Sequence, residues 1–199
     1  YYLRVVEIQE RYASDLVKTA NCFQTNGLLL DEKWLDFCSK YGFGIGVSFD
    51  GPKRFHDRQR PIPGSASSSY DSVLNSIKLL QSCCFPFIVT CVVAKAGIKS
   101  PDEYWYYFME EGIYDLEFLP CLSYGVNRGS SINSVSDSSF SRFLERIFDL
   151  WMDSGNESVS IRTLENIIWN TVEGLQSNHC QLCGRCRDFY TITTDGCLY

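Results

Sequence analysis

The chain has 199 residues, 45% of them hydrophobic and 15% aromatic, so it is long and apolar enough to bury a core. Its net charge of −6 argues against a general nucleic-acid binder, which would carry a basic face. No apolar run approaches the roughly 18 residues of a membrane span, and the first residues match neither a signal peptide nor a transit peptide.

Strand and helix patterns alternate along the chain. Helical patterns cover the first residues and then 31–42, 70–80, 101–112, 140–151 and 161–172, with Asp31 as a plausible N-cap, Gly42 as a stop and Pro101 in a first turn. Strand patterns cover 21–26, 43–50, 85–94 and 114–122. Strands separated by helices indicate βαβ units, so the sequence predicts an α/β fold with a parallel sheet and right-handed crossovers. An open sheet and a partial (β/α) barrel both fit this order.

The strand pattern at 43–50 has two different faces, although a parallel strand covered on both sides should be apolar throughout. Its apolar residues alternate with small or polar ones, namely Gly44, Gly46, Ser48 and Asp50. The pattern at 21–26 likewise turns Cys22, Gln24 and Asn26 to one side. Two such strands leave room for a ligand at the strand carboxyl ends, which Asn26-Gly27 and Asp50-Gly51 mark. The alternative is tight helix packing against glycine, with ordinary turn caps.

Three cysteines with C-x2-C-x2-C spacing stand near the end of the chain: Cys180, Cys183 and Cys186. Thiolates at this spacing can converge on one metal centre, and iron–sulfur clusters are bound by such spacings. Zinc is the rival, with His179 as a possible fourth ligand, and unpaired or disulfide-bonded cysteines are the remaining alternative. The flanking cations favour the thiolate form, and they are Arg185 and Arg187. Residues 187–199 then predict a β-hairpin with an Asp-Gly turn.

The other seven of the ten cysteines are scattered, several of them in apolar settings. Cys38 shares a helical face with Trp34 and Tyr41, and Cys91 lies in an apolar run, where a thiol behaves as a small hydrophobic group. We therefore expect a reduced, cytoplasmic protein with one special cysteine cluster rather than a disulfide scaffold.

Several short motifs follow one another along the chain in an order that is typical of one enzyme family. QTNG at 24–27, SFDGP at 48–52 and HDRQR at 56–60 are followed by LEFLPCL, VSIR and a cysteine-rich loop with TTDG. Over essentially the whole chain, these residues resemble the radical S-adenosylmethionine (SAM) enzymes with a C-terminal SPASM domain, and among them the anaerobic sulfatase-maturating enzymes. QTNG alone is a weak signal, whereas the ordered set is strong.

The resemblance implies a partial (β/α)6 barrel followed by the start of a SPASM-type, Cys-rich β-hairpin. Residues 1–135 would belong to the barrel, 136–176 to linking helices and 177–199 to a truncated SPASM domain. The implied cofactors are SAM and [4Fe–4S] clusters, which together give a 5′-deoxyadenosyl radical that abstracts hydrogen from a peptide, so that a Cys or Ser side chain becomes formylglycine. The implied partners are a peptide or unfolded sulfatase and an electron donor such as flavodoxin or ferredoxin, with no nucleic acid and no membrane.

The resemblance also gives roles to single residues. Ser48 matches a Ser that contacts SAM, Arg60 matches an Arg that pairs with the SAM carboxylate, and Leu122 matches a residue that lines the adenosyl site. An Arg is well suited to a carboxylate, and Ser48 lies on the small inner face. The alternatives are a strand-end cap for Ser48, a solvated loop charge for Arg60 and a core position for Leu122.

Other positions are assigned less directly. Gln24 and Asn26 face inward and join the expected pocket, whereas the His56-Asp57 pair is read as loop structure. The resemblance assigns two ligands of an auxiliary [4Fe–4S] cluster to Cys180 and Cys186. It assigns none to Cys183, which is a bystander or an alternative ligand, and Cys197 is read as incidental.

Expected motifs are missing at both ends. The family's C-x3-C-x2-C and GGE motifs would precede Tyr1, and Pro-Cys-Asp, with a cluster ligand and the general base, would follow Tyr199. We therefore expect a fragment, inactive by itself, that contains no catalytic residue. Two other functions stay open: a radical SAM/SPASM maturase that makes a thioether or other crosslink in a ribosomally made peptide, and a zinc-stapled module without catalysis.

Overall fold

The structure is a computed structural model, and it describes residues 1–14, 19–62, 64, 68–123, 133–172, 190–193 and 195–197. Within them lies one sheet of five strands, β1 (Asn21–Thr25), β2 (Phe43–Ser48), β3 (Phe87–Val93), β4 (Asp115–Pro120) and β5 (Ser160–Ile161). The helices are α1 (Tyr2–Tyr12), α2 (Glu32–Tyr41), α3 (Lys53–Gln59), α4 (Tyr70–Ser82), α5 (Pro101–Glu110), α6 (Asp137–Ser154) and α7 (Arg162–Val172). In these ranges, no helix is both long enough and apolar enough to cross a bilayer.

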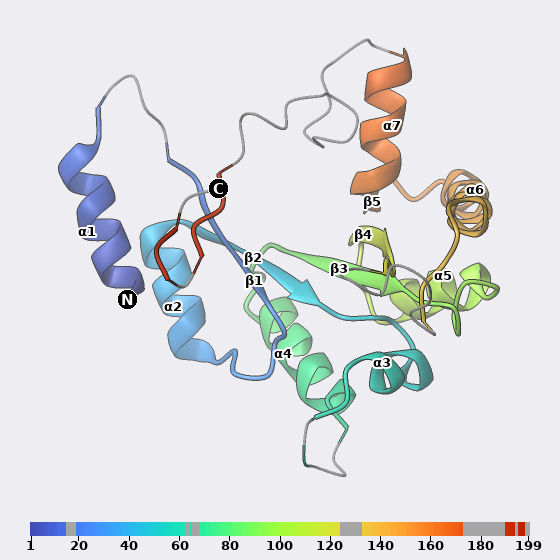
Figure 1. Ribbon diagram of the computed structural model, residues 1–199, viewed down its shortest axis with the longest axis horizontal. Helices are drawn as coiled ribbons and strands as arrows, with labels where there is room; N and C mark the ends of the chain where they lie inside the picture. The colour runs from blue at the N-terminus through green and yellow to red at the C-terminus, as the bar shows by residue number, and fades with distance from the viewer. Residues whose placement is uncertain are drawn as a thin grey trace.

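The strands lie side by side in the order in which the chain makes them, β1-β2-β3-β4-β5, and each neighbouring pair is parallel. Right-handed crossovers that always step in the same direction put their helices on the same face of a sheet. In Figure 1, α2, α4, α5 and α6 accordingly follow one another around the outside of the sheet. The predicted α/β fold is confirmed, and its sheet is that of an open part of a (β/α) barrel.

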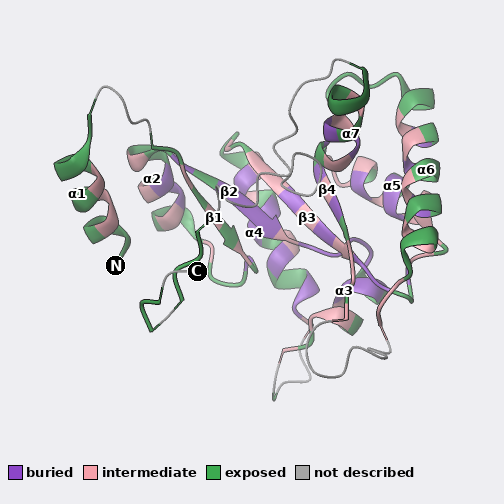
Figure 2. Ribbon diagram, turned by 45° about the horizontal axis from the view of Figure 1, so that its top comes forward, coloured by how far each residue is buried: buried purple, intermediate pink, exposed green. Residues whose placement is uncertain are grey.

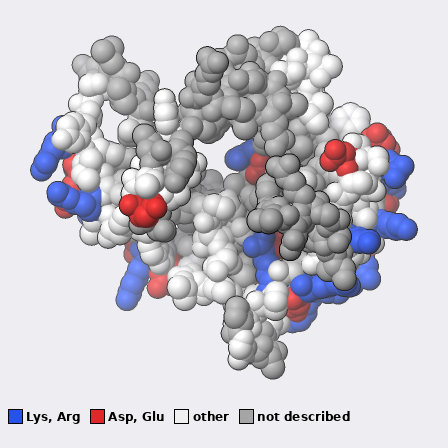
Figure 3. All heavy atoms as spheres, viewed as in Figure 1, with Lys and Arg blue, Asp and Glu red and all other residues white. Residues whose placement is uncertain are grey.

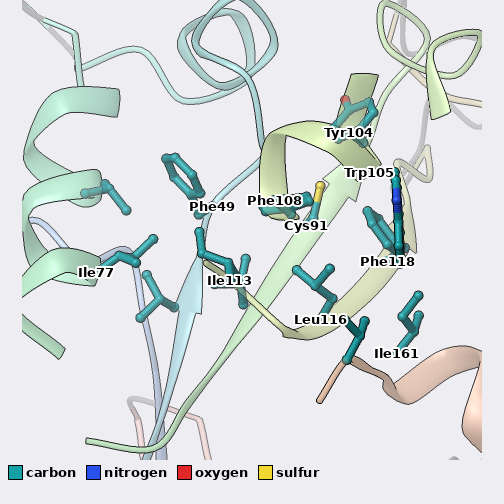
Figure 4. Close-up of a cluster of buried hydrophobic side chains, with 14 of the residues drawn as sticks. Phe49, Ile77, Cys91, Tyr104, Trp105, Phe108, Ile113, Leu116, Phe118 and Ile161 are labelled. Carbon is teal, nitrogen blue, oxygen red and sulfur yellow. The ribbon is translucent and has the colours of Figure 1, made fainter. Parts of the chain in front are cut away.

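The helix-covered face of the sheet carries the hydrophobic core. On β3, Val89, Cys91 and Val93 are completely buried, and the residues between them are only half-buried. Figure 4 shows Cys91, Leu116 and other strand side chains converging with aromatic residues of α5, and Figure 2 shows the buried residues concentrated on the sheet and on the inward sides of the helices. Complete burial of one such aliphatic side chain contributes roughly 1.5–3 kcal/mol.

The ends of α2 agree with the sequence prediction. The Asp31 carboxylate accepts a hydrogen bond from the backbone N–H of Trp34 at 3.0 Å, which satisfies one of the free N–H groups of the first turn. Gly42 ends the helix with φ of 68°, and its N–H donates to the Cys38 carbonyl. Pro101 likewise stands in the first turn of α5, where no N–H is needed.

Two elements differ from the sequence prediction. The segment that contains His56 and Asp57 was read as a loop, but it forms α3, whose Phe55 and His56 are buried. The sheet also has a fifth strand, β5, which pairs with β4 through only two residues and is too short to produce a recognisable pattern.

The C-terminal hairpin is described only around its turn. There the prediction of an Asp-Gly turn is confirmed, because Gly196 adopts φ of 84° and its N–H donates to the Thr193 carbonyl at 2.9 Å. The Thr193 N–H donates in turn to the Cys197 carbonyl at 3.0 Å. Most of the two predicted arms lies outside the described residues.

Candidate functional site at the carboxyl ends of the strands

On the face of the sheet opposite the core, the first two strands carry small or polar side chains. The Gln24 side chain donates to the Ser48 hydroxyl at 3.0 Å across β1 and β2. Gly46 lies beside them, and a Cβ added there would stand 2.2 Å from the Gln24 side-chain oxygen. Further along the same face, the Thr90 hydroxyl of β3 donates to the Glu117 carboxylate of β4 at 3.4 Å. The predicted polar alternation is therefore present, and it extends over four strands.

Asp50 closes the carboxyl end of β2. The backbone pairing of β2 with β3 ends at Ser48 and Thr90, and Gly51, directly after Asp50, adopts φ of 75°. The Asp50 side chain takes over, and its Oδ1 accepts the N–H of Val92 at 2.9 Å. The Asp50 carboxylate is only 1% exposed, and a buried charge of this kind requires a partner.

Arg60 supplies that partner from the C-terminal end of α3. Its Nε donates to Oδ2 of Asp50 at 2.7 Å and its Nη2 to Oδ1 at 3.1 Å, which makes a bidentate ion pair. The Arg60 side chain is 28% exposed, so the guanidinium lies at the protein surface, at the rim of the sheet edge, while the Asp50 carboxylate lies in the interior. The ion pair with Asp50 argues against the alternative interpretation of Arg60 as a solvated loop charge, and the predicted contact of Arg60 with a carboxylate ligand stays a prediction.

A buried histidine connects the two ends of this segment. His56 Nδ1 accepts the backbone N–H of Asp50 at 3.2 Å, so Nε2 carries the ring proton and donates to the Ser69 hydroxyl at 3.0 Å. The Ser69 hydroxyl donates onward to the carbonyl of Arg60 at 2.5 Å. Burial lowers the pKa of His56, and the positive charge of Arg60 acts in the same direction, while Asp50 opposes it. The neutral ring that this hydrogen-bond pattern requires is thus also the favoured form.

The other predicted site residues lie along the same edge of the sheet. Ser48 is the last residue of β2, and Leu122 stands two residues beyond β4, where it is exposed rather than part of the core. Asn26 follows β1 and lines a cavity of about 190 Å³ together with Arg60. All four positions therefore meet the carboxyl ends of the strands, where ligands bind in folds of this kind. Figure 3 shows Lys and Arg side chains gathered over α3, next to this edge.

Two residues of the site, Asp50 and His56, were missed by the sequence analysis. Asp50 was placed on the polar face of its strand and read as a marker of the strand end without a role in the site, and His56 was read as part of a loop, because polar residues beside Pro and Gly usually face water. No periodic pattern marks either residue as buried. The order of Asp50, His56 and Arg60 within one short segment was the available signal, since residues of these types form ion-pair and hydrogen-bond networks.

The cysteine cluster cannot be placed in this geometry. Cys180, Cys183 and Cys186 lie outside the described residues, as does His179, so their metal site stays a prediction. Among the residues that the structure does describe, no group of three or more His, Cys, Asp or Glu side chains is arranged to hold a metal ion. Cys197 is described and exposed.

A singly wound parallel sheet with helices on one face, and with polar residues gathered at the strand carboxyl ends of the other, defines an open (β/α)-barrel protein with a candidate site at that edge. No family model matches the chain. Over its whole length, the chain is 29% identical to a Cysteine-type anaerobic sulfatase-maturating enzyme of Clostridium perfringens, covering 54% of that protein. It is 26% identical to a Serine-type anaerobic sulfatase-maturating enzyme of Bacteroides thetaiotaomicron, covering 51% of that protein.

Comparison with solved structures leads to the same group. The structure of native anSMEcpe with bound AdoMet matches 90% of this chain with a TM-score of 0.80 and 29% sequence identity, over 49% of its own length. The structure of Streptococcus suis SuiB bound to S-adenosylmethionine, with a TM-score of 0.55 and 12% identity, shares the fold alone. The predicted resemblance is confirmed, because the chain is similar over its whole length to the anaerobic sulfatase-maturating enzymes and in fold to an AdoMet-bound one. It spans about half the length of the relatives that it matches.

Proposed function

We propose that the protein is a radical SAM enzyme that matures sulfatases, oxidising a Cys or Ser side chain of the substrate peptide to formylglycine. The observation that carries this proposal is the match of the chain to anaerobic sulfatase-maturating enzymes, over its whole length in sequence and over 90% of it in fold, including an AdoMet-bound structure. Relatives of both the Cysteine type and the Serine type match over the same residues, so the choice between Cys and Ser belongs to the experiment.

The described residues fit a sulfonium nucleotide. SAM needs space for an adenosyl group and a cation to meet its carboxylate. Gly44 and Gly46 add no side chains to the inner face of β2, where the Gln24 side chain lies next to Gly46, and Arg60 presents a partly exposed guanidinium from the C-terminal end of α3, beside the end of the same strand. Glycine at these positions is consistent with a ligand that approaches the backbone closely.

Each proposed contact is implied by the resemblance, and the position of its residue in the fold is compatible with it. The Ser48 hydroxyl already accepts a hydrogen bond from Gln24, so it has its own proton to donate to the cofactor. Arg60 would bind the SAM carboxylate, and Leu122 would cover the adenosyl group with an exposed apolar side chain. When bound beside a [4Fe–4S] cluster, SAM supplies the 5′-deoxyadenosyl radical that abstracts hydrogen from the peptide.

The remaining parts of the proposal lie at the C-terminal end. Residues 1–135 would form part of the barrel, 136–176 the connection and 177–199 the start of a SPASM domain, in which Cys180 and Cys186 ligate an auxiliary [4Fe–4S] cluster. Such a cluster gives electrons from the substrate a path out of the site, and a small redox protein such as flavodoxin or ferredoxin would supply the electron for SAM cleavage.

The test is anaerobic turnover by the purified full-length protein. It is incubated with SAM, a reductant and two peptides that differ only in carrying Cys or Ser at the target position, and the products are analysed by mass spectrometry. Conversion of either side chain to an aldehyde, together with release of 5′-deoxyadenosine, supports the proposal. A crosslinked peptide would instead favour the maturase of a ribosomally made peptide, and a colourless protein that contains zinc and forms no 5′-deoxyadenosine would overturn the radical mechanism.

A matched pair of variants tests the site. Arg60→Met should abolish most of the activity, because it removes the proposed carboxylate ligand. Arg58→Met removes an exposed cation of the same helix, α3, and should leave turnover within about twofold, as expected of surface substitutions.

A further inference from the structure

Arg60 has more hydrogen-bonding capacity than its ion pair uses. A guanidinium carries five N–H groups in a fixed plane. Asp50 engages the Nε–H and one N–H of Nη2, and within the described part of the chain no hydrogen bond to Nη1 is present. Asp50 therefore leaves three N–H groups of Arg60 unused, and two of them, one on each Nη atom, share the terminal edge of the guanidinium. Two donors on one edge suffice for a bidentate contact with a carboxylate.

The direction of that edge is set by the buried carboxylate. Asp50 is fixed by the Val92 N–H on one side, and its own N–H is fixed by His56, so it cannot follow Arg60 outward. With 1% exposure for Asp50 and 28% for Arg60, the pair points from the interior toward the rim. A long side chain at a rim would otherwise sample many rotamers, and its ordering would cost free energy on binding.

The backbone of Arg60 is held as well. Its N–H donates to the carbonyl of His56 at 2.8 Å, at the end of α3. Its carbonyl accepts the hydroxyl proton of Ser69 at 2.5 Å, and Ser69 is itself held by Nε2 of His56. Both the backbone and the side chain of Arg60 are thus tied to groups that are buried in the protein.

We propose that Asp50 is a positioning residue, which holds the Arg60 guanidinium so that its remaining N–H groups face the carboxylate of the bound nucleotide, with the His56–Ser69 pair fixing the Arg60 backbone. This inference rests on the proposed function, because it takes SAM as the ligand. Positioning by Asp50 would strengthen the binding of the nucleotide carboxylate. The negative charge of Asp50 has the opposite effect, because a carboxylate beside Arg60 reduces the attraction of the guanidinium for a second anion. The sign of the change on removing the Asp50 charge therefore decides between positioning and simple neutralisation.

The test uses two probes that differ only in the carboxylate. These are S-adenosylhomocysteine and its decarboxylated analogue S-adenosyl-3-thiopropylamine, and their affinities for the reconstituted full-length protein are measured by calorimetry. Asp50→Asn keeps an oxygen for the Val92 N–H and removes the charge. It should lower the affinity for S-adenosylhomocysteine by about tenfold, which is the loss expected for a charge-assisted contact that is no longer aligned. The affinity for the decarboxylated analogue should change by less than about twofold.

Further variants complete the test. Arg60→Met should lower the affinity for the carboxylated probe only. The double variant Asp50→Asn with Arg60→Met should lose little more affinity than Arg60→Met alone, because both changes act on one contact. If Asp50→Asn does not fold, Ser69→Ala serves as a second variant, and it should lower the affinity for the carboxylated probe alone by a few fold. Tighter S-adenosylhomocysteine binding by Asp50→Asn, or equal losses for both probes, would overturn the positioning role. A parent protein that binds neither probe would instead refute the proposed function.

Discussion

The close approach of Gly97 to Tyr104 gives a sharp test of the packing. Tyr104 of α5 is completely buried, and its ring stacks on Phe55 with a centroid separation of 5.0 Å and meets the edge of Phe143 at 5.5 Å. A Cβ at Gly97 would stand 2.2 Å from the Tyr104 hydroxyl and 2.8 Å from two ring carbons. Because the ring is enclosed on several sides, it cannot move away cheaply.

The expected cost of Gly97→Ala can be worked from two opposing effects. Overpacking of a filled core costs about 1–3 kcal/mol, and the loss of backbone freedom in the unfolded chain returns about 0.4–1 kcal/mol. We therefore expect the free energy of unfolding to fall by about 1–2 kcal/mol. Tyr104→Phe removes the atom in closest contact, and since no described residue hydrogen-bonds to that hydroxyl, the single change should alter stability by less than about 1 kcal/mol.

The assay is urea unfolding of the full-length protein and its variants, followed by far-ultraviolet circular dichroism in reducing, anaerobic buffer. The double variant Gly97→Ala with Tyr104→Phe should recover part of the loss, because only the ring-carbon contacts remain. Gly44→Ala is the control, since a Cβ there would lie 3.7 Å from its nearest neighbour and should not destabilise by overpacking. Overpacking by the added Cβ is refuted if Gly97→Ala is as stable as the parent, or if the double variant is no more stable than Gly97→Ala.

Three further predictions concern the two faces of the sheet and the buried histidine. Leu116→Ala should lower the unfolding free energy by about 2–5 kcal/mol in urea unfolding, whereas Leu119→Ala, on the other face of the same strand and 36% exposed, should cost less than about 1 kcal/mol; equal losses would contradict the assigned faces. Burial lowers the pKa of His56 below its usual 6.5, so the folded protein loses stability as the pH falls from about 6.5 through the lower pKa of the folded state. The side chain of His56→Asn does not titrate, so this variant should show a weaker pH dependence of the urea midpoint between about pH 7.5 and about pH 5.5. Gly46→Ala should weaken the binding of S-adenosylhomocysteine by about tenfold, because the added Cβ would stand 2.2 Å from the Gln24 side-chain oxygen and would displace the side chain that hydrogen-bonds to Ser48, while Gly44→Ala should have a smaller effect on the affinity measured by calorimetry; unchanged binding by Gly46→Ala would count against a ligand on this face.

The sequence predicts most of the sheet and little of the hydrogen bonding at its edge. The span of α2 could be predicted because Asp31 and Gly42 act locally, and β2 could be predicted because alternation is visible within the strand itself. The helix α3 was missed because it is short, highly charged and preceded by Pro52, so its local pattern resembles a loop. Strand β5 was missed because two residues have no period.

The site shows the same division between local and distant causes. Ser48 and Arg60 could be named from motifs, and Asp50 stands only ten residues before Arg60, but no local pattern shows that the two side chains form a buried pair. The burial of Asp50 depends on the Val92 N–H of another strand and on the guanidinium at the end of α3, and both arrive only with the tertiary fold. A polar residue next to glycine gives no local sign that it will be enclosed.

The sequential order of the strands also bears on how the molecule assembles. Each strand pairs with the one that was made before it, so the sheet can be extended by one strand and one helix at a time, without inserting a late segment between two earlier ones. Such a sheet is suited to folding during translation, because the early units can form while the ribosome still holds the later ones. On this view Arg60, Asp50 and Val92 come together as soon as β3 has emerged, before the last two strands exist.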